Sequence, residues 1–288
     1  MKKLQLKKLQ LYIPVIFLIL ITLIFTYGIF FYQYSPNSNS NLLLSSPTKE
    51  HILGTDDLGI DIFAQLSSGF FYSMIIGSFT AIISGILGLI IGTIGGYFEG
   101  RIKNFVDFII SIALSIPQLP ILIVIGAFFK PRLSNLIIVL SIFSWAPIAR
   151  VIKGNVENIK NKGYIKMSRA YGASYFHIFK NHILKDIYPL VSISTLKVIG
   201  KAIVQESSLA FLGLSDPTSK TWGLMINYSI NFKGIYFTQF WKWWLMPPVM
   251  LLTLTILSLT MINRYFEIKT LRGEEIGTIK NKEIKSSI

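Results

Sequence analysis

One stretch decides how the rest of the chain is interpreted: YIKMSRAYGASYFHIFKNHILKDIYP, residues 164–189. It is the longest polar-flanked segment between apolar runs that are each long enough to cross a bilayer. Apolar or aromatic side chains recur in steps of three and four, on one face of a helix, at Tyr164, Met167, Tyr171, Tyr175 and Ile178. Gly172 interrupts this pattern, and Ser174 can cap a second helix. The stretch therefore predicts two short helices hinged at a glycine, and such a unit outside a membrane needs something to dock on.

The overall composition indicates a membrane protein. Of the 288 residues 52% are hydrophobic, and an ordinary soluble domain reaches only about 45–50% even when glycine is counted. The formal charge is +14, but the basic residues lie in the links between apolar runs, which argues against a nucleic-acid-binding surface. The chain has no cysteine, which excludes disulfides and thiolate metal sites.

Six apolar runs predict six membrane-spanning helices and an all-α fold. They cover residues 11–32, 73–98, 105–129, 135–151, 187–212 and 246–262. The first run is longer than the apolar region of a signal peptide, about 7–15 residues, so we expect it to stay uncleaved. Pro117, Pro120 and Pro147 are expected to kink the third and fourth spans. Trp241, Trp243 and Trp244 precede the last span and predict anchors at the membrane interface.

The second apolar run carries small residues about four apart. They are Gly77, Ala81, Gly85, Gly88, Gly92 and Gly96. Small side chains at this spacing let another helix approach closely. The sequence leaves two alternatives open, a tight contact within the same fold and a contact with a second chain.

The distribution of Lys and Arg predicts the orientation. When the links between the six runs are numbered from the amino terminus, the two terminal segments and the second and fourth links together hold twenty of these residues. The first, third and fifth links hold six. Because cytoplasmic links are enriched in these residues, both termini and the stretch 164–189 are expected to be cytoplasmic.

Several kinds of chemistry are missing from the sequence. There is no phosphate-binding loop, since Gly200-Lys201 is followed by Ala202 and lies in an apolar run. The histidines are His51, His177 and His182, which are too dispersed for a convincing metal cluster. No nucleophile with a base and an orienting group is recognisable. We therefore expect no catalytic residue, no metal site, and no ATP hydrolysis by this chain.

The fifth run contains three charged residues, Lys197, Lys201 and Glu206. A charge at the bilayer centre costs about 2.5–3.5 kcal/mol on insertion scales, so it usually faces a partner, water or the bundle interior. Lys197 can reach the interface along its aliphatic stem. Glu206 either lines a polar cavity, pairs with a basic residue such as Lys201, or lies at the outer interface. Lys201 and Glu206 are the candidates for a translocation pathway.

An ordered set of motifs links the chain to a known family. They are HILGTDDLGIDIF at 51–63, IGGYFEG at 94–100, LSIPQLP at 114–120, SWAPIAR at 144–150, RAYGAS at 169–174, NHILKD at 181–186, ESSLAFLGLSDP at 206–217 and TWGLMI at 221–226. With these motifs the chain resembles the second permease subunit of the dipeptide/oligopeptide/nickel importers. The stretch around Gly172 resembles the cytoplasmic loop motif of ABC importer permeases in general.

The resemblance implies a six-span type I importer fold with cytoplasmic coupling helices, in a bacterial cell (inner) membrane. The implied partners are membrane lipid, a homologous second permease, two cytoplasmic ATPases that use ATP and Mg, and an extracytoplasmic substrate-binding protein. The implied solute is a peptide or a related small molecule, with nickel or a metal chelate as the alternative. An ion-coupled secondary carrier is less favoured because we find no inverted repeat.

The apolar runs and the expected orientation predict a domain layout, and the resemblance implies a set of docking residues. The layout is a tail with the first span (1–32), an extracytoplasmic segment (33–72), a five-span core (73–266) with its coupling loop at 152–186, and a cytoplasmic tail (267–288). The ATPase-docking residues would be Arg169, Ala170, Gly172, Ala173, Ser174, His182, Ile183 and Leu184. The chain departs from the family pattern at Lys166, Met167 and Ser168, where Glu-Ala-Ala is usual, and at Lys185, where proline is usual.

Overall fold

The computed structural model describes residues 2–128 and 132–286, and it places side chains for residues 11–128 and 132–270. The helices in chain order are α1 (Lys2–Phe30), α2 (Ile62–Tyr97), α3 (Arg101–Ser115), α4 (Gln118–Phe128), α5 (Leu133–Lys160), α6 (Gly163–Ala170), α7 (Tyr175–Ile178), the π-helical turn η1 (Phe179–Ile183), α8 (Leu184–Phe211), α9 (Trp222–Asn231), the 3₁₀ turns η2 (Lys233–Tyr236) and η3 (Phe240–Lys242), and α10 (Met246–Ser286). Within these described residues no strand forms, and the all-α prediction is confirmed.

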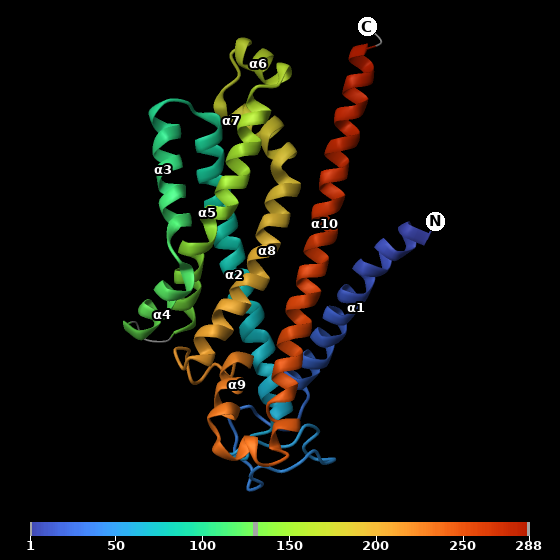
Figure 1. Ribbon diagram of the computed structural model, residues 1–288, viewed down its shortest axis with the longest axis vertical. Helices are drawn as coiled ribbons and strands as arrows, with labels where there is room; N and C mark the ends of the chain where they lie inside the picture. Colours follow the sequence, from blue (N-terminus) through green and yellow to red (C-terminus); the bar gives the residue numbers. More distant parts are fainter. Residues whose placement is uncertain (1, 129–131, 287–288) are drawn as a thin grey trace.

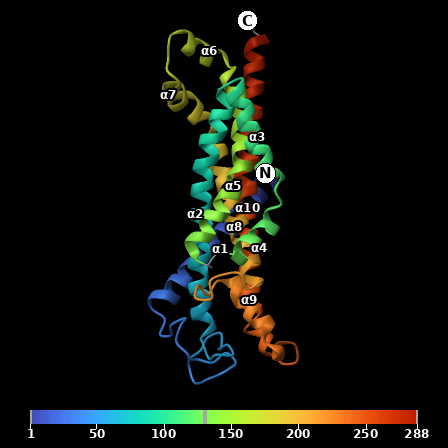
Figure 2. The same ribbon diagram turned by 90° about the vertical axis from the view of Figure 1, so that its left-hand side faces the viewer.

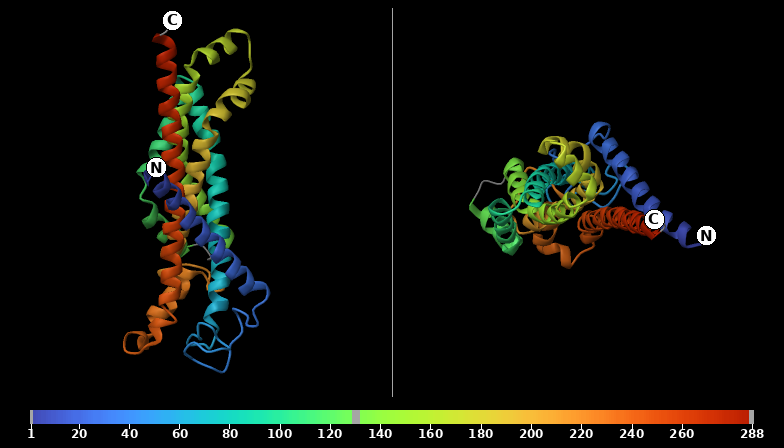
Figure 3. Two further views of the ribbon diagram at one scale, coloured as in Figure 1. Left: turned by 90° about the vertical axis from the view of Figure 1, so that its right-hand side faces the viewer. Right: turned by 90° about the horizontal axis from the view of Figure 1, so that it is seen from above.

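The long helices form one elongated bundle (Figure 1). Helix α2 packs against both α5 and α8, while α1 and α10 contact each other along one side. Seen along the bundle, α3 and α4 lie at the opposite side from α1 and α10 (Figure 3). Helices α6 and α7 project from one end of the bundle, and α9 with the segment 33–61 lies at the other (Figures 1 and 2). We refer to these as the α6–α7 end and the α9 end.

The number of spans agrees with the sequence pattern. Five helical runs of the described chain are long and apolar enough to cross a membrane, and α3 with α4 supplies a sixth when the two count as one. These two helices are bent by 78° at the break between them. Pro117 lies at this break, as expected, whereas Pro147 lies inside the continuous α5. The end of the third predicted span, Phe129, lies outside the described residues.

The small residues of α2 form a contact within the fold. A Cβ on Gly88 would lie 2.7 Å from the Cβ of Ile148, and one on Gly85 would lie 2.6 Å from the hydroxyl of Thr195. All six small residues are buried. They let α5 and α8 approach α2 closely, which decides between the two alternatives that the sequence left open.

We expect Gly92→Ala to lower the melting temperature of the purified protein, because the new Cβ would lie 2.7 Å from the backbone oxygen of Ala149. Overpacking of this kind costs about 1–3 kcal/mol. Gly154→Ala in α5 is the matched control, since a Cβ there meets nothing within 4 Å. Alanine gains about 1 kcal/mol over glycine in a helix, so this control should not lower the melting temperature. Equal changes in the two variants would contradict the close approach of α2 and α5.

Helix α2 begins at Ile62, well before residue 73, where the sequence predicted the span to start. The side chain of Asp61 caps the helix by accepting a hydrogen bond from the N–H of Ala64 at 2.9 Å. The added turns are buried because Leu66 and Phe70 pack in one cluster with Trp222. Helix α2 therefore runs through the predicted segment boundary at residues 72 and 73. Helices α5 and α10 likewise extend beyond the apolar runs that predicted them.

The loop predicted between the fifth and sixth spans contains a helix, α9. Its first residue, Trp222, is fully buried, and its indole N–H donates to the carbonyl of Leu66 at 3.0 Å. Trp244 is also buried in the same cluster, so the prediction of an interfacial anchor is wrong for this residue. The pattern missed this helix because its tryptophan packs against α2, which is distant in the sequence.

Candidate functional site

The hinge at Gly172 is built as the sequence predicts. Gly172 has φ +80° and follows the end of α6. Its N–H donates to the carbonyl of Arg169 at 3.0 Å, and the N–H of Ala173 donates to Ser168 at 3.0 Å. This pair of bonds is the Schellman arrangement that ends helices at a glycine. The hydroxyl of Ser174 then accepts from the N–H of His177 at 3.3 Å and caps α7.

The inner face of this loop is held by isoleucines. Ile165, Ile178 and Ile183 are fully buried in one apolar cluster that also contains Val156 and Ile159 of α5. The sequence pattern placed Ile178 on one face with Tyr164, Met167 and Tyr171, and this is wrong, because those three side chains are exposed. The hinge turns α7 relative to α6, so one helical period does not continue across Gly172.

The outer face of the loop exposes large apolar side chains. Tyr171 is 83% exposed and Phe176 is 69% exposed, and they flank the hinge. A Cβ placed on Gly172 would meet nothing within 4 Å. Lys166 and Arg169 are exposed nearby. The outer face of the loop is therefore aromatic and basic, and we call it the docking face. Behind it, the inner face is packed against the bundle. Exposed apolar patches of this kind mark interaction sites.

A second set of contacts joins the loop to the turn between α2 and α3. The guanidinium of Arg169 lies 4.9 Å from the centre of the Tyr97 ring, and the Tyr175 ring lies 4.6 Å from the same ring. Lys160 forms an ion pair with Glu99 at 3.1 Å. The hydrogen bond from Lys160 and its positive charge lower the pKa of the Glu99 carboxyl. The loop is thus in contact with the end of α2 and the link that follows it, as well as with α5.

The start of α6 is tied to the start of α8 through Asp186. This carboxylate accepts hydrogen bonds from Lys162 at 3.1 Å and from the Tyr164 hydroxyl at 2.8 Å. Partial burial and the bond to Asp186 raise the pKa of Tyr164. Asp186 belongs to the motif NHILKD, and its structural role was not predicted from the sequence.

The π-helical turn η1 joins α7 to α8 without a break in the helix. The N–H of Leu184 donates to the carbonyl of Phe179, and π-turns of this kind are frequent at functional sites. His182 is half-buried, with its ring centre 5.6 Å from that of Tyr164. Ile183, one of the predicted docking residues, is fully buried, so its side chain packs inside the loop in this structure.

The charged residues of α8 do not form one site. Lys197 pairs with Glu267 of α10 at 2.8 Å. Glu206 is fully buried, where the hydroxyls of Ser207 and Ser215 donate to it at 3.4 and 3.5 Å. Its predicted pairing with Lys201 is wrong, because residues five apart lie about 140° apart around a helix.

Lys201 is exposed in a groove between α8 and α10 of about 560 Å³. Among the residues with described side chains no ion pair involves Lys201. The polar residues of α10 in this groove are Thr260, Asn263, Arg264 and Glu267. They recur at steps of three and four where the apolar part of α10 ends, a spacing that can be recognised in the sequence alone. We call this surface the polar groove.

Residues 86–272 match the model of the family described as the binding-protein-dependent transport system inner membrane component. The chain belongs to this family. The matched part of this inner membrane component includes the hinged loop, Lys201 and the polar groove.

Individual relatives agree with this assignment. The inner membrane component is 30% identical to the dipeptide transport system permease protein DppC of Bacillus subtilis over 218 residues, 75% of this chain and 67% of the relative. It is also 30% identical to the oligopeptide transport system permease protein OppC of the same organism over 250 residues, 85% of this chain and 80% of the relative. These matches confirm the resemblance inferred from the motifs.

The fold also agrees with a solved structure. An inward-facing form of the MetNI methionine ABC transporter is similar with a TM-score of 0.55 and 19% identity, over 70% of this chain and 96% of that chain. The ABC importer permease fold is therefore confirmed for this inner membrane component. Among the described side chains no group of three His, Cys, Asp or Glu residues could hold a metal ion.

We expect Ile165→Ala to destabilise the packing of α6 against the bundle in this inner membrane component, because Ile165 is the buried residue of α6. Truncating a fully buried isoleucine costs about 2–5 kcal/mol. Hydrogen exchange of the α6 amides should become at least tenfold faster. Met167→Ala changes an exposed side chain of the same helix and should leave the exchange rates close to those of the unaltered protein. Similar rates in the two variants would show that Ile165 does not hold the loop.

Proposed function

We propose that this chain is one of two homologous membrane subunits of an ATP-driven peptide importer. The observation that carries the proposal is the docking face, where the exposed Tyr171 and Phe176 flank a glycine hinge. A surface of this shape fits a groove on a partner protein. The relatives named as dipeptide and oligopeptide permeases support peptides as the solute.

The energy source in this proposal is a pair of cytoplasmic ATPases, since the chain has no phosphate loop of its own. The ATPases, and not this chain, would bind ATP and Mg. The docking residues exposed or half-exposed for this contact are Arg169, Ala170, Gly172, Ala173, Ser174, His182 and Leu184. The loop motif lacks its usual acidic residue at Lys166, so we expect the partner groove to complement a basic side chain there.

Coupling follows from the continuity of the helix from Tyr175 to Phe211. A displacement of α7 by an ATPase would be transmitted along α8 to the depth of Lys201 and Glu206. The buried isoleucines and Asp186 make the loop and the ends of α5 and α8 move together. Such a rigid connection lets closure of the ATPases change which side of the membrane the pathway faces.

The orientation that fits this function has the α6–α7 end and both termini in the cytoplasm. The excess of Lys and Arg in the corresponding links supports it. The α9 end would then face the extracytoplasmic binding protein. The polar groove would face the second permease and the pathway, because an exposed lysine inside a span is costly against lipid.

Uptake by the reconstituted importer tests this proposal. The second permease, the ATPases and the binding protein are placed with this chain in proteoliposomes, and uptake of labelled peptides and labelled nickel is compared with and without internal ATP. We expect ATP-dependent peptide uptake and co-purification with two ATPase chains. Nickel uptake without peptide uptake would favour a metal importer. Uptake driven by an ion gradient without ATP would overturn the assignment.

A further inference from the structure

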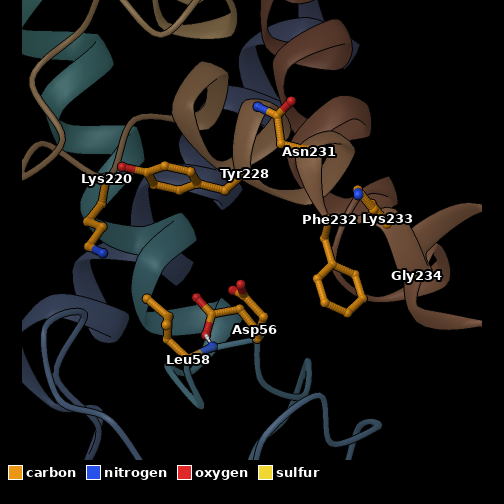
Figure 4. A pocket seen from close by; sticks show the side chains of 9 residues that line it. Asp56, Leu58, Lys220, Tyr228, Asn231, Phe232, Lys233 and Gly234 are labelled. Atoms are coloured by element: carbon orange, nitrogen blue, oxygen red, sulfur yellow. Dashed lines mark hydrogen bonds between the residues drawn. The ribbon is translucent and has the colours of Figure 1, made fainter.

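A cavity of about 810 Å³ opens at the α9 end (Figure 4). Its volume falls within the range of small-molecule sites, about 300–1000 Å³. Asp57 and Leu58 come from the segment before α2, Lys220 comes from the segment before α9, and Tyr228 and Lys233 come from α9 and η2. The cavity thus brings both signs of charge and an aromatic ring together from three parts of the chain.

The acidic wall carries two adjacent carboxylates with different roles. Asp56 is used within the fold, since it accepts hydrogen bonds from the N–H groups of Leu58 and Ile60 at 2.9 and 2.8 Å and from the side chain of Gln65 at 2.6 Å. Asp57 is half-buried and forms no ion pair within the described side chains. Burial and the neighbouring charge of Asp56 raise the pKa of Asp57. A cationic group placed in the cavity would relieve this repulsion.

The basic wall is formed by a residue in a strained conformation. Lys220 has φ +47°, a region that residues other than glycine rarely adopt and that costs about 1–3 kcal/mol. Its backbone is held there by close packing, because a Cβ on Gly69 would lie 2.6 Å from the carbonyl oxygen of Lys220. Figure 4 shows the Lys220 amine turned toward the wall that carries Leu58. Strain of this kind persists where the surrounding structure imposes it, and it is common at ligand sites.

The rest of the lining suits a small organic ligand better than a bare ion. The ring of Tyr228 lies beside Lys220 in the close-up view, and Phe232 lies on a third side (Figure 4). Lys233 adds a second ammonium group to the lining. Two lysines oppose a free divalent cation, and a single available carboxylate is too few ligands for one.

We propose that this cavity binds a short peptide in its zwitterionic form, with the free amino group at Asp57 and the free carboxylate at Lys220. The proposal rests on the proposed function as a peptide importer and names a second contact for its substrate, on the α9 side. Opposite charges on facing walls would recognise both ends of a peptide, while the aromatic rings contact its apolar side chains. Di- and tripeptides fit a cavity of about 810 Å³.

The test uses the intact complex of both permeases and the ATPases in nanodiscs, without the binding protein. Binding of labelled Ala-Phe is compared with binding of its N-acetylated and its C-amidated forms. The unaltered complex should bind free Ala-Phe at least tenfold more tightly than either blocked form. In Asp57→Asn, free and N-acetylated Ala-Phe should bind equally well, while the preference for free over C-amidated Ala-Phe remains. Lys220→Gln should remove the preference against the amidated peptide only, and Lys220→Arg should retain it.

Several outcomes would overturn the proposal while leaving the proposed function intact. Each variant is first shown by size exclusion to assemble with the second permease and the ATPases, so that misfolding is recognised. If the unaltered complex binds no dipeptide, or if both variants keep both preferences, the cavity is not a peptide site. If the variants weaken only capture of the binding protein, the cavity is a protein contact. The proposed function fails separately, when ATP-dependent peptide uptake with saturating binding protein is absent in the unaltered complex.

Discussion

Gly172→Asp is expected to reduce ATP-dependent uptake about a hundredfold or more and to release the ATPases from the membrane complex. Gly172 lies at the centre of the docking face, between the exposed Tyr171 and Phe176. An aspartate there would place an unpaired carboxylate inside a contact that excludes water. The cost of an uncompensated buried charge is about 3 kcal/mol or more, and 1.4 kcal/mol corresponds to a factor of ten.

Gly213→Asp is the matched control, because Gly213 closes α8 with the same geometry. It has φ +75°, its N–H donates to Ala210 at 2.9 Å, and the N–H of Leu214 donates to Leu209 at 2.9 Å. A Cβ at Gly213 or at Gly172 would meet nothing within 4 Å. The backbone strain of the substitution is therefore similar at both positions, so a difference between the two variants reports the surroundings of the new carboxylate.

Two measurements distinguish the effects of these substitutions. The ratio of ATPase to permease after affinity purification reports docking, and uptake into proteoliposomes reports coupling. We expect both to fall for Gly172→Asp and to stay within about threefold of the unaltered complex for Gly213→Asp. Equal losses in the two variants would assign the effect to backbone strain. An unchanged ratio in Gly172→Asp would show that the ATPases bind elsewhere.

The hinge was predictable because its chemistry is local. A glycine in the left-handed region and a serine with a free hydroxyl are enough to end one helix and begin the next. The small face of α2 was readable for the same reason. The sequence could not predict which helices cover this face, because α5, α8 or a helix of a second chain would all require the same small residues.

The missed features depend on contacts between distant parts of the chain. Ile165 and Ile178 are buried because α5 continues past its apolar run and offers Val156 and Ile159 to the loop. Helix α9 is held by Trp222, whose partner lies on α2. By contrast, the separation of Lys201 from Glu206 could have been foreseen from their spacing, since five residues turn a helix by about 140° beyond one full turn.

Lys201→Glu is expected to lower uptake at least tenfold while the ATPases remain bound. Lys201 lies ten residues before the end of α8 at Phe211, about 15 Å along the helix axis, inside the apolar run that is predicted to span the membrane. An exposed ammonium without an ion pair at this depth is stable only against water or a partner. Reversing its charge should therefore change what the polar groove can accommodate.

Three further variants distinguish a position in the pathway from a lipid-facing position. Lys201→Arg keeps the charge and should retain most of the uptake. Lys197→Gln removes a neighbouring lysine whose charge is already paired with Glu267. It should change the free energy of unfolding by no more than about 1 kcal/mol, the usual limit for an exposed ion pair. If Lys201 faced lipid, Lys201→Leu would raise the melting temperature and leave uptake unchanged. If it faces the pathway, Lys201→Leu lowers uptake. The polar groove then loses the one ammonium group that is not paired with a carboxylate on α8 or on the described part of α10.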